Sequence, residues 1–556
     1  MLHLPVELVL SVLQYLPLST LHNLLSTSRE WNNFFGVNQS ILYHNAAVVH
    51  GFTRSSSVAY SDLHTVFSRR ALTGVTDWKT FCYTQLHIQK AWRGKASSSV
   101  TAHRSSGVNV HRIKVDEERG FIIVTTSSGG LFVVNLYEDE ILWSLPATYV
   151  HPYAHCEYSG GYLVFDRTTG EKEVWRVVDD AEMTPTSPTF AFSDERQHTT
   201  SSLAATLHSP LTTRGHFKPW AVLRPSATTR AFRLVYPTLI AATTNCIFVW
   251  DIRTGELVQV IQDAPISPNG VGSSIILGSV NYVEVSARAD GHAFICGSNT
   301  LRIFSRASGR CVLDVPSSQS SYGNNTYSLT VDGSRQQDRW VSSSVLKPQP
   351  TTHRVVPPTN GRRLIDEFLA VHVSACGSHF VALLASSRLI VVPFFERIIG
   401  GTVDIRDIAL DIQLGSPVTV ARYLAFEYGR VGVTTDTGLF VVSIDFESIR
   451  DSIEPPRVSI YRAAWFNSPI LLRHVSCLQM TSTGIFLTWD PSPSARDYRD
   501  EDLVPSFEYE RTFASSLNEQ RRLGRLPNGD EVVQLFELGA FHQGRSTAFS
   551  IDLVPP

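Results

Sequence analysis

From about residue 96 onward the sequence repeats one short plan, and this repeat constrains the fold more than any other feature. Each copy has a strand-like run rich in small residues, a tight polar turn, a second strand-like run that carries an aromatic residue, and often a Thr-Gly or Ser-Gly turn. Strands that recur at this spacing with no helices between them predict a β-propeller rather than a parallel α/β fold. Seven copies are recognisable: GFIIVTTSSGGLFVVNLYEDEILWSL, YSGGYLVFDRTTGEKEVWRVV, LIAATTNCIFVWDIRTGELVQVI, HAFICGSNTLRIFSRASGRCVLDV, HFVALLASSRLIVVPFF, RVGVTTDTGLFVVSID and SCLQMTSTGIFLTWD.

The repeats predict seven blades, with eight as the alternative. Residues 505–556 contain two further strand-like runs, VVQLFEL and STAFSIDLV. These runs could complete a blade, close the ring together with strands from the start of the repeat region, or form an eighth blade. Three segments interrupt the repeats, near 180–200, 316–362 and 495–526, and their polar composition predicts long exposed loops.

The first ninety-odd residues have a helical period instead. Leucines and valines recur at helical spacing between residues 4 and 16, Pro5 suits a first helical turn, and Pro17 forbids continuation. A helix is therefore predicted over roughly 5–16. A second helix is predicted from Ser19, and Ser28 can cap a third. Three short helices within about 35 residues bury too little apolar surface to be stable alone, so the segment needs a partner surface.

The segment LPVELVLSVLQYLPLSTLHNLLSTSREWNNFF resembles the F-box, the motif that docks onto the Skp-family adaptor of SCF ubiquitin ligases. The alternative is an ordinary amphipathic helical cap on the following domain. The resemblance is carried by Leu4-Pro5, Glu7-Leu8, Leu13, Leu16-Pro17, Leu21 and Ser28-Arg29 followed by Trp31. It implies adaptor contacts from Leu4, Pro5, Leu8, Val9, Leu13, Leu16, Pro17 and Leu21.

A helical linker is predicted to join this segment to the repeats. The stretch DWKTFCYTQLHIQKAWRGK is similar to the one that precedes the propeller in F-box proteins with WD repeats. Such a linker, with its own apolar face, is expected to be rigid, although a spacer without geometric purpose is the alternative. Trp250-Asp251 resembles the closing strand of a WD repeat, and most other copies lack this dipeptide. The predicted organisation is a three-helix F-box at 1–43, a helical linker at 44–95 and a degenerate WD-like propeller at 96–556, an α plus all-β multidomain chain.

Charge and cysteine usage narrow the function classes. The formal net charge is -3 and charged residues make up only 18%, so the chain has no electrostatic footprint for nucleic acid and no polybasic membrane anchor. No run of 18 or more apolar residues is present, as a membrane span would need. The seven cysteines never form a C-x-x-C pair, which favours a reducing compartment and hence a cytoplasmic or nuclear location.

No catalytic, cofactor or metal site is predicted. His151, His155 and Cys156 lie close together in sequence, but they fall in a strand-and-turn region where the H-x-x-x-H spacing does not suit zinc. The chain is therefore expected to be non-catalytic and to carry no cofactor.

The resemblance implies the substrate-recognition subunit of an SCF-type ubiquitin ligase. The F-box would bind a Skp-family adaptor and, through it, a cullin scaffold, while the propeller would hold an unidentified target protein. Whether recognition needs phosphorylation stays open; Arg288, Arg302 and Arg306 lie in or beside one repeat, and clustered arginines suit phosphate. The alternatives are an F-box scaffold without ubiquitin transfer and, less favoured, a propeller enzyme with a helical cap.

Overall fold

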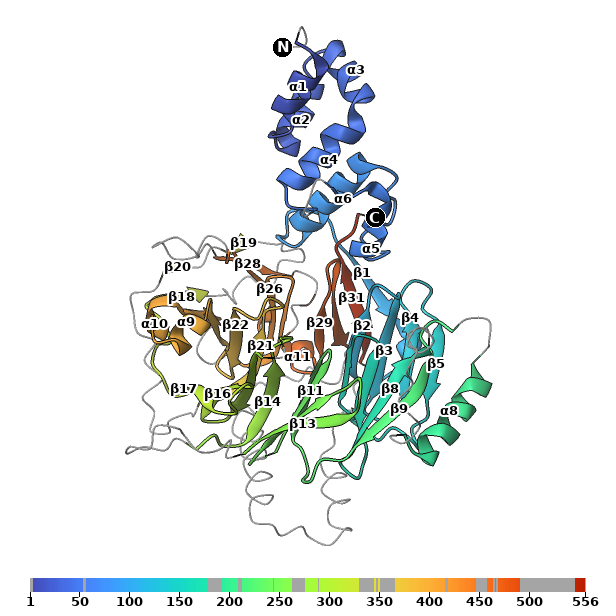
Figure 1. The fold of residues 1–556 in the computed structure, drawn as a ribbon, viewed down its shortest axis with the longest axis vertical. Coiled ribbons are helices and arrows are strands. Elements are labelled where there is room, and N and C mark those ends of the chain that lie inside the picture. Colours follow the sequence, from blue (N-terminus) through green and yellow to red (C-terminus); the bar gives the residue numbers. More distant parts are fainter. Residues whose placement is uncertain are drawn as a thin grey trace.

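In a computed structural model the chain forms a helical arm standing on a broad β-domain (Figure 1). The arm contains the N-terminus, and the C-terminal strand returns to its base (Figure 1). The structure describes residues 4–555 except 54–56, 179–192, 209–212, 244, 263–275, 289, 330–344, 347–348, 351–365, 416–418, 447–457, 464–465, 467–468 and 491–545.

The arm is built from short helices whose ends follow from the sequence. Ser28 caps the third helix, because its hydroxyl oxygen accepts a hydrogen bond from the backbone N–H of Trp31 at 3.2 Å. The second helix begins at Leu18, directly after Pro17, so Ser19 lies inside it rather than at its cap as predicted. The arm helices are α1 (Val6–Leu13), α2 (Leu18–Leu25), α3 (Arg29–Val37), α4 (Gln39–Val49), η1 (Tyr60–Asp62), α5 (Leu63–Val66) and α6 (Trp78–Ala91).

One continuous core holds the arm together. Leu13 of α1 and Phe35 of α3 are buried in the same cluster as Trp78 and Phe81 of α6. The three short N-terminal helices therefore find part of their missing partner surface on α4 and α6 of this chain. Asp77 caps α6, accepting a hydrogen bond from the backbone N–H of Thr80 at 2.7 Å.

The β-domain is a propeller of seven blades, and each blade contains one of the seven predicted copies. Neighbouring inner strands contact one another all the way round the ring. The inner strands are β2 (Val110–Asp116), β6 (Cys156–Ser159), β10 (Ala231–Val235), β14 (Val280–Val285), β21 (Phe368–Val373), β25 (Ala421–Glu427) and β29 (Leu478–Met480).

Each blade continues outward in antiparallel register from its inner strand. The outer strands of the first four blades are β3 (Phe121–Thr126), β4 (Leu131–Asn135) and β5 (Ile141–Leu145); β7 (Tyr162–Asp166), β8 (Lys172–Val177) and β9 (Phe217–Leu223); β11 (Thr238–Ala242), β12 (Ile247–Asp251) and β13 (Glu256–Ile261); β15 (His292–Gly297), β16 (Thr300–Ser305) and β17 (Cys311–Pro316). Those of the fifth and sixth are β22 (Phe380–Leu384), β23 (Arg388–Val392) and β24 (Leu410–Leu414); β26 (Arg430–Thr435), β27 (Gly438–Ile444) and β28 (Val458–Arg462).

The ring closes by joining the two ends of the repeat region in the seventh blade. There β30 (Gly484–Trp489) pairs with β31 (Thr547–Asp552), and β31 pairs with β1 (Ser99–His103) as the outermost strand. The run STAFSIDLV thus completes a blade and closes the ring, and the propeller has seven blades rather than the alternative eight. The run VVQLFEL lies outside the described residues.

Two of the predicted loops are partly ordered structure. Between 180 and 200, residues from Glu195 onward belong to helix α8 (Glu195–Leu207), because buried Gln197 donates hydrogen bonds to the carbonyls of Val174 and Ala221. Between 316 and 362, strand β18 (Asn325–Leu329) adds to β24 in parallel, and Tyr322 is buried. Two short strands also fall there: β19 (Val345–Leu346) pairs with β28, and β20 (Gln349–Pro350) with β18. The segment 495–526 lies outside the described residues.

The arm and the propeller share a second core at the base of α6. Ile88, Ala91 and Trp92 pack with residues of the sixth and seventh blades. Trp92 also donates its indole N–H to the carbonyl of Ser482 at 3.2 Å, and Arg70 forms an ion pair with Asp552 of β31. Because α6 lies in the arm core at one end and in the propeller core at the other, it joins the two parts by packing. This packing supports the rigid linker that the sequence predicted.

Candidate docking and target-binding surfaces

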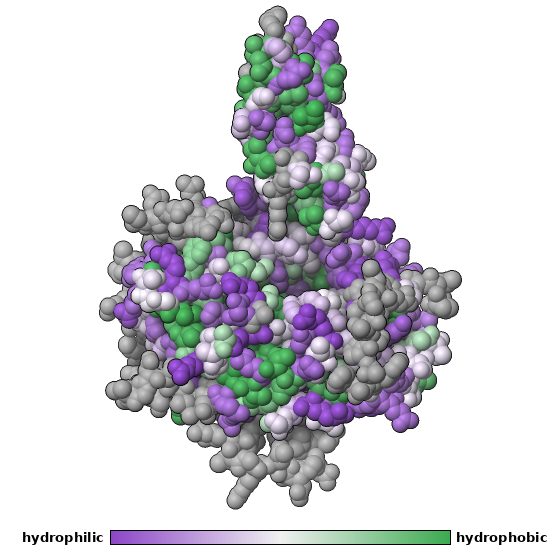
Figure 2. Space-filling view, in the orientation of Figure 1, coloured by the Kyte–Doolittle hydropathy of each residue, from purple (hydrophilic) through white to green (hydrophobic). Residues whose placement is uncertain are grey.

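Helix α1 presents an apolar stripe to solvent at the far end of the arm. Leu8 and Val12 lie four residues apart on α1, Leu4 lies just before the helix begins, and 44–53% of each residue is exposed. Hydrophobic side chains are visible along this end of the arm in Figure 2. A row of exposed aliphatic side chains on one helix face is typical of a surface that packs against a partner.

The eight predicted adaptor contacts divide between this surface and the arm's own core. Leu4, Pro5, Leu8 and Pro17 are exposed and Leu16 is half-buried. Val9, Leu13 and Leu21 are each only 1% exposed and pack inside the arm. Their predicted adaptor contact is therefore corrected, because a side chain enclosed by its own domain supports the docking helix and does not touch a partner.

Several exposed apolar residues of the arm were missed. Val6 and Tyr15 flank the α1 stripe, and Val37 and Ile41 are exposed on α3 and α4. The four-residue spacing from Leu8 to Val12 was readable in the sequence and would have added Val12. The exposure of Val37 was not readable, because it depends on how α3 packs against its neighbours.

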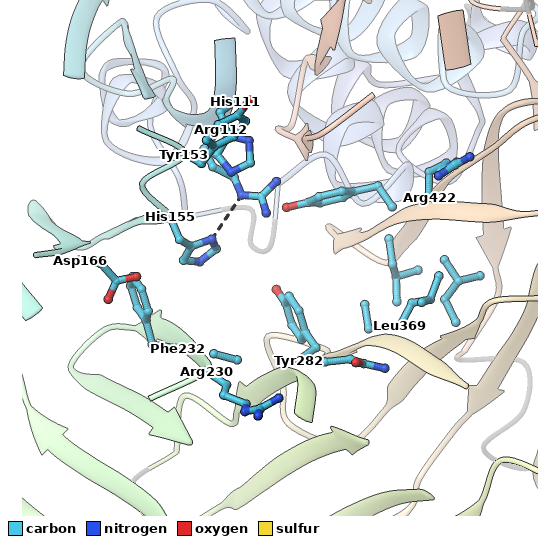
Figure 3. A pocket seen from close by; sticks show the side chains of 16 residues that line it. His111, Arg112, Tyr153, His155, Asp166, Arg230, Phe232, Tyr282, Leu369 and Arg422 are labelled. Atoms are coloured by element: carbon cyan, nitrogen blue, oxygen red, sulfur yellow. Dashed lines mark hydrogen bonds between the residues drawn. The ribbon is translucent and has the colours of Figure 1, made fainter. Parts of the chain in front are cut away.

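At the centre of the propeller the inner strands enclose a cavity of about 310 Å³. Most of its lining residues lie at or just before the starts of six inner strands, and Asp166 and Leu383 come from the neighbouring strands β7 and β22. Arg112, His155 and Tyr282 point toward one shared space (Figure 3). Arg112 donates from Nε to His155 Nδ1 at 3.3 Å, so His155 has its proton on Nε2. Arginine, histidine and tyrosine side chains give this cavity many hydrogen-bond donors for a side chain of a bound protein.

Beneath the cavity a belt of opposite charges links successive blades. Glu157 of β6 accepts ion pairs from Lys114 of β2 at 3.0 Å and from Arg233 of β10 at 2.9 Å. Arg233 continues to Glu284 of β14 at 3.3 Å, and Glu284 meets His372 Nδ1 of β21 at 2.7 Å. The Nε2 atom of His372 then lies 3.1 Å from the backbone oxygen of Leu424 in β25. Six of the seven inner strands are thereby fixed to one another by buried polar contacts.

The belt holds its carboxylates ionised despite their burial. Burial alone would raise the pKa of Glu157, but Lys114, Arg233 and His155 together hold it well below its usual range. Glu284 behaves in the same way, with burial outweighed by Arg233 and His372, so its pKa is also lowered. At His111 in the cavity wall, burial and the positive charge of the neighbouring Arg112 act in the same direction. Together they lower its pKa to about 3.

The cavity opens on the face of the propeller away from the arm. Six of the seven inner strands begin at the cavity. At the other ends of the inner strands, the hairpins of the sixth and seventh blades meet the arm's base. Trp92 bonds to Ser482 in the β29–β30 hairpin and packs under Arg430, which follows the β25–β26 turn. Glu117 of the β2–β3 hairpin accepts hydrogen bonds from Thr481 at 3.0 Å and Ser482 at 2.8 Å. The docking stripe and the cavity therefore lie at opposite ends of the molecule.

Comparison with known proteins decides what the arm's outer helices are. The F-box-like family matches residues 1–45, the segment that carries the α1 stripe. This segment is an F-box-like domain. An F-box-like domain followed by a seven-bladed propeller is typical of non-enzymatic adaptors, and F-box domains generally bind Skp-family adaptors.

The comparisons add little beyond the F-box-like domain. No curated protein sequence matches the chain. Among solved structures, the Cps50 (Swd1) β-propeller domain of Myceliophteria thermophila aligns with 71% of this chain and 96% of its own length, at 9% identity and a TM-score of 0.39. A likeness this distant carries no argument about function, and the propeller assignment rests on the seven sheets themselves.

Three propeller arginines are candidates for phosphate binding on sequence grounds: Arg288, Arg302 and Arg306. Their side chains do not converge on one open site. Arg302 is fully buried and pairs with Asp314 at 3.2 Å. Arg288 pairs with Asp290 at 3.4 Å, and Arg306 donates to the backbone oxygen of Arg288 at 3.0 Å. Their hydrogen bonds are thus directed at groups of the propeller itself.

The residues that the structure describes contain neither a metal cluster nor a membrane-spanning helix. No group of three or more His, Cys, Asp and Glu side chains there could hold a metal ion. Within the same residues, no helix is both long enough and apolar enough to cross a membrane.

Proposed function

We propose that this chain is the substrate-recognition subunit of an SCF-type ubiquitin ligase. The F-box-like domain would dock on a Skp-family adaptor, which holds a cullin, and the propeller would bind the target protein. The observation that carries the proposal is the apolar stripe of Leu4, Leu8 and Val12, which the F-box-like domain leaves exposed while Val9 and Leu13 fill its core. Removal of such a surface from water supplies most of the affinity in docking of this kind.

The geometry suits a receptor that positions a bound protein. Ubiquitin transfer would be accelerated by proximity and orientation, since this chain would neither make nor break a bond. The shared core at α6 keeps the docking stripe at a fixed distance from the propeller. The donors at the cavity mouth, among them Arg112 and Tyr282, are the groups we propose for contact with the target. We place this activity in the cytoplasm or nucleus, on the cysteine usage of the sequence.

A scaffold that binds the adaptor without ubiquitin transfer is the alternative, and one experiment separates the two. Proteins that copurify with the chain after proteasome inhibition are identified by mass spectrometry, and the best candidate is incubated with the chain, adaptor, cullin and the ubiquitin-charging enzymes. The proposal expects ubiquitination that the double variant Leu4→Glu/Leu8→Glu abolishes. The matched control is Leu207→Glu, at an exposed leucine on α8, which should leave transfer intact. Complex formation without transfer would instead establish the scaffold.

A further inference from the structure

A second cavity lies where the base of the arm meets the sixth blade. Its volume is about 230 Å³, and it opens between the end of α6 and the strands β26 and β27. In Figure 1 this junction lies beneath α6, on the same side of the propeller as the arm. This cavity is separate from the central one. Its propeller residues lie at the β25–β26 turn and at the end of β27, whereas the central cavity lies at the starts of the inner strands. The lining residues are Gln89, Trp92, Arg93, Tyr428, Gly429, Arg430, Ser443 and Ile444.

Two guanidinium groups line this junction cavity, and no carboxylate does. Arg430 lies over the indole ring of Trp92, with its guanidinium carbon 4.9 Å from the ring centroid. Burial lowers the pKa of Arg430 to about 10, and the like charge of Arg93 adds to the effect. Within the part of the chain that the structure describes, neither arginine has an ion pair. Two positively charged side chains thus line one partly enclosed space, and the carboxylates that act on Tyr428 beside them, Glu117 foremost, lie outside the lining.

Two other buried arginines of this propeller are each paired with a carboxylate, whereas Arg430 has none in the described part of the chain. Arg388 pairs with Asp411, and Arg302 pairs with Asp314. Glu427 stands opposite Arg430 in the β25–β26 hairpin, yet the charges that act on it are those of the central belt, Arg233 foremost. The carboxylate next along the arm's base, Glu117, is already bonded to the turn at Thr481.

The end of α6 does not neutralise the two arginines either. Its last carbonyl oxygens accept backbone hydrogen bonds, from Trp92 to Ile88 at 2.9 Å and from Arg93 to Lys90 at 3.0 Å. Arg93 and Arg430 both belong to the cavity lining. The amide of Gln89 and the hydroxyl of Ser443 add neutral donors beside them.

We propose that this junction cavity binds the phosphate of a phosphate monoester. A dianion balances two guanidinium charges, and three terminal oxygens can accept hydrogen bonds from donors on several sides at once. A single carboxylate has one charge and two oxygens, and would leave part of the donor set unused. The phosphate could belong to a phosphorylated side chain of a bound protein or to a free phosphorylated molecule, and both present the same chemistry. This site is independent of the proposed ligase function, because it touches neither the docking stripe nor the central cavity.

Equilibrium dialysis of the purified full-length chain with radiolabelled inorganic phosphate tests the site. We expect saturable binding of one phosphate per chain, and at least tenfold weaker binding for Arg430→Ala and for Arg93→Ala. Arg310→Ala removes the same charge from an exposed turn of another blade and should bind as the natural chain does. Arg93 is exposed, so its variant keeps the test valid if Arg430→Ala does not fold. Absence of saturable binding, or equal loss in Arg310→Ala, would overturn the proposal.

Competition experiments distinguish the two sources of the phosphate. A phosphoserine peptide that displaces the labelled phosphate at a lower concentration than free phosphoserine does would support a phosphorylated protein. Equal displacement by the two would support a small phosphorylated molecule. Displacement by the matching glutamate peptide at a concentration as low as that of the phosphoserine peptide would contradict the choice of phosphate. Sodium chloride at matched ionic strength should displace none of the labelled phosphate. Salt would displace a phosphate that is attracted only by two exposed charges, whereas a partly enclosed site is screened much less.

Discussion

The outer face of α1 and the central cavity of the propeller are both exposed to solvent, but they are built in opposite ways. The α1 face offers Leu4, Leu8 and Val12, which have no polar partner and no fixed geometry beyond the helix itself. The cavity offers Arg112 and Tyr282, held above a belt whose ion pairs join five inner strands and whose His372 contacts a sixth.

The difference shows how each surface can recognise a partner. Aliphatic side chains on a helix gain free energy in proportion to the area that they bury, so the α1 face suits one partner of complementary shape. Charged and aromatic groups at fixed positions reject partners that leave them unpaired, so the cavity suits selection among different proteins. A chain with both can keep one invariant attachment and one selective surface, as the proposed function requires.

Breaking the belt should have the largest effect on stability. Glu157→Gln removes the charge shared by Lys114 and Arg233, which leaves buried Lys114 without this carboxylate and Arg233 with Glu284 alone. We expect a loss of about 3–5 kcal/mol, seen as a lower midpoint of thermal unfolding of the propeller. Asp251→Asn breaks an ion pair with Arg253, whose side chain is 54% exposed, and should cost at most about 1 kcal/mol. Equal effects of the two substitutions would contradict the structural importance of the belt.

Two leucines of the arm separate folding from docking. Leu13→Ala opens a cavity in the arm core and should cost about 2–5 kcal/mol. Leu8→Ala, five residues earlier at an exposed position, should change stability by no more than about 0.5 kcal/mol. Denaturation followed by circular dichroism at 222 nm measures both variants. Similar destabilisation by the two would mean that the α1 stripe is buried in solution and not available for docking.

The smallest expected effect is a dependence of stability on pH at the cavity wall. The folded-state pKa of His111 is about 3, below the value of about 6.5 in an unfolded chain, so protons bind preferentially to the unfolded state between these values. The contribution of His111 to stability is therefore complete above pH 6.5 and declines as the pH falls toward 3. At pH 5 the loss is about 2 kcal/mol.

Melting temperatures measured at pH 7.5 and pH 5 test this dependence on His111. His111→Gln should show a smaller fall between the two pH values than the natural chain. His64→Gln, at an exposed position on α5, should fall as much as the natural chain does. An unchanged fall in His111→Gln would show that other groups control the acid response.

The sequence predicted the repeats well because each blade is encoded locally. A strand, a turn and a second strand lie within about 25 residues, so all seven copies could be read before any were paired. The belt could not be read, since Lys114, Glu157, Arg233, Glu284 and His372 come from different copies and meet only when the ring closes.

The errors in the arm and in the insertions have physical causes of the same kind. The apolar stripe of α1 predicted a helix, but it did not indicate that Leu8 faces solvent while Val9 faces the core. Helix α8 was read as a loop because it has no apolar stripe, and buried Gln197 holds it to the blade by hydrogen bonds instead. The junction cavity was invisible for a similar reason, because Arg93 and Arg430 are more than 300 residues apart.

The affinity of the full-length chain for a purified Skp-family adaptor tests the central claim most directly. Isothermal titration should show one adaptor bound per chain, and Leu8→Glu should weaken the Kd by about 100-fold, since a charge at the centre of an apolar contact cannot be paired. Leu207→Glu places the same charge at an exposed leucine on α8 and should bind as tightly as the natural chain. A natural chain that does not bind, or a Leu8→Glu variant that binds with unchanged affinity, would contradict the account.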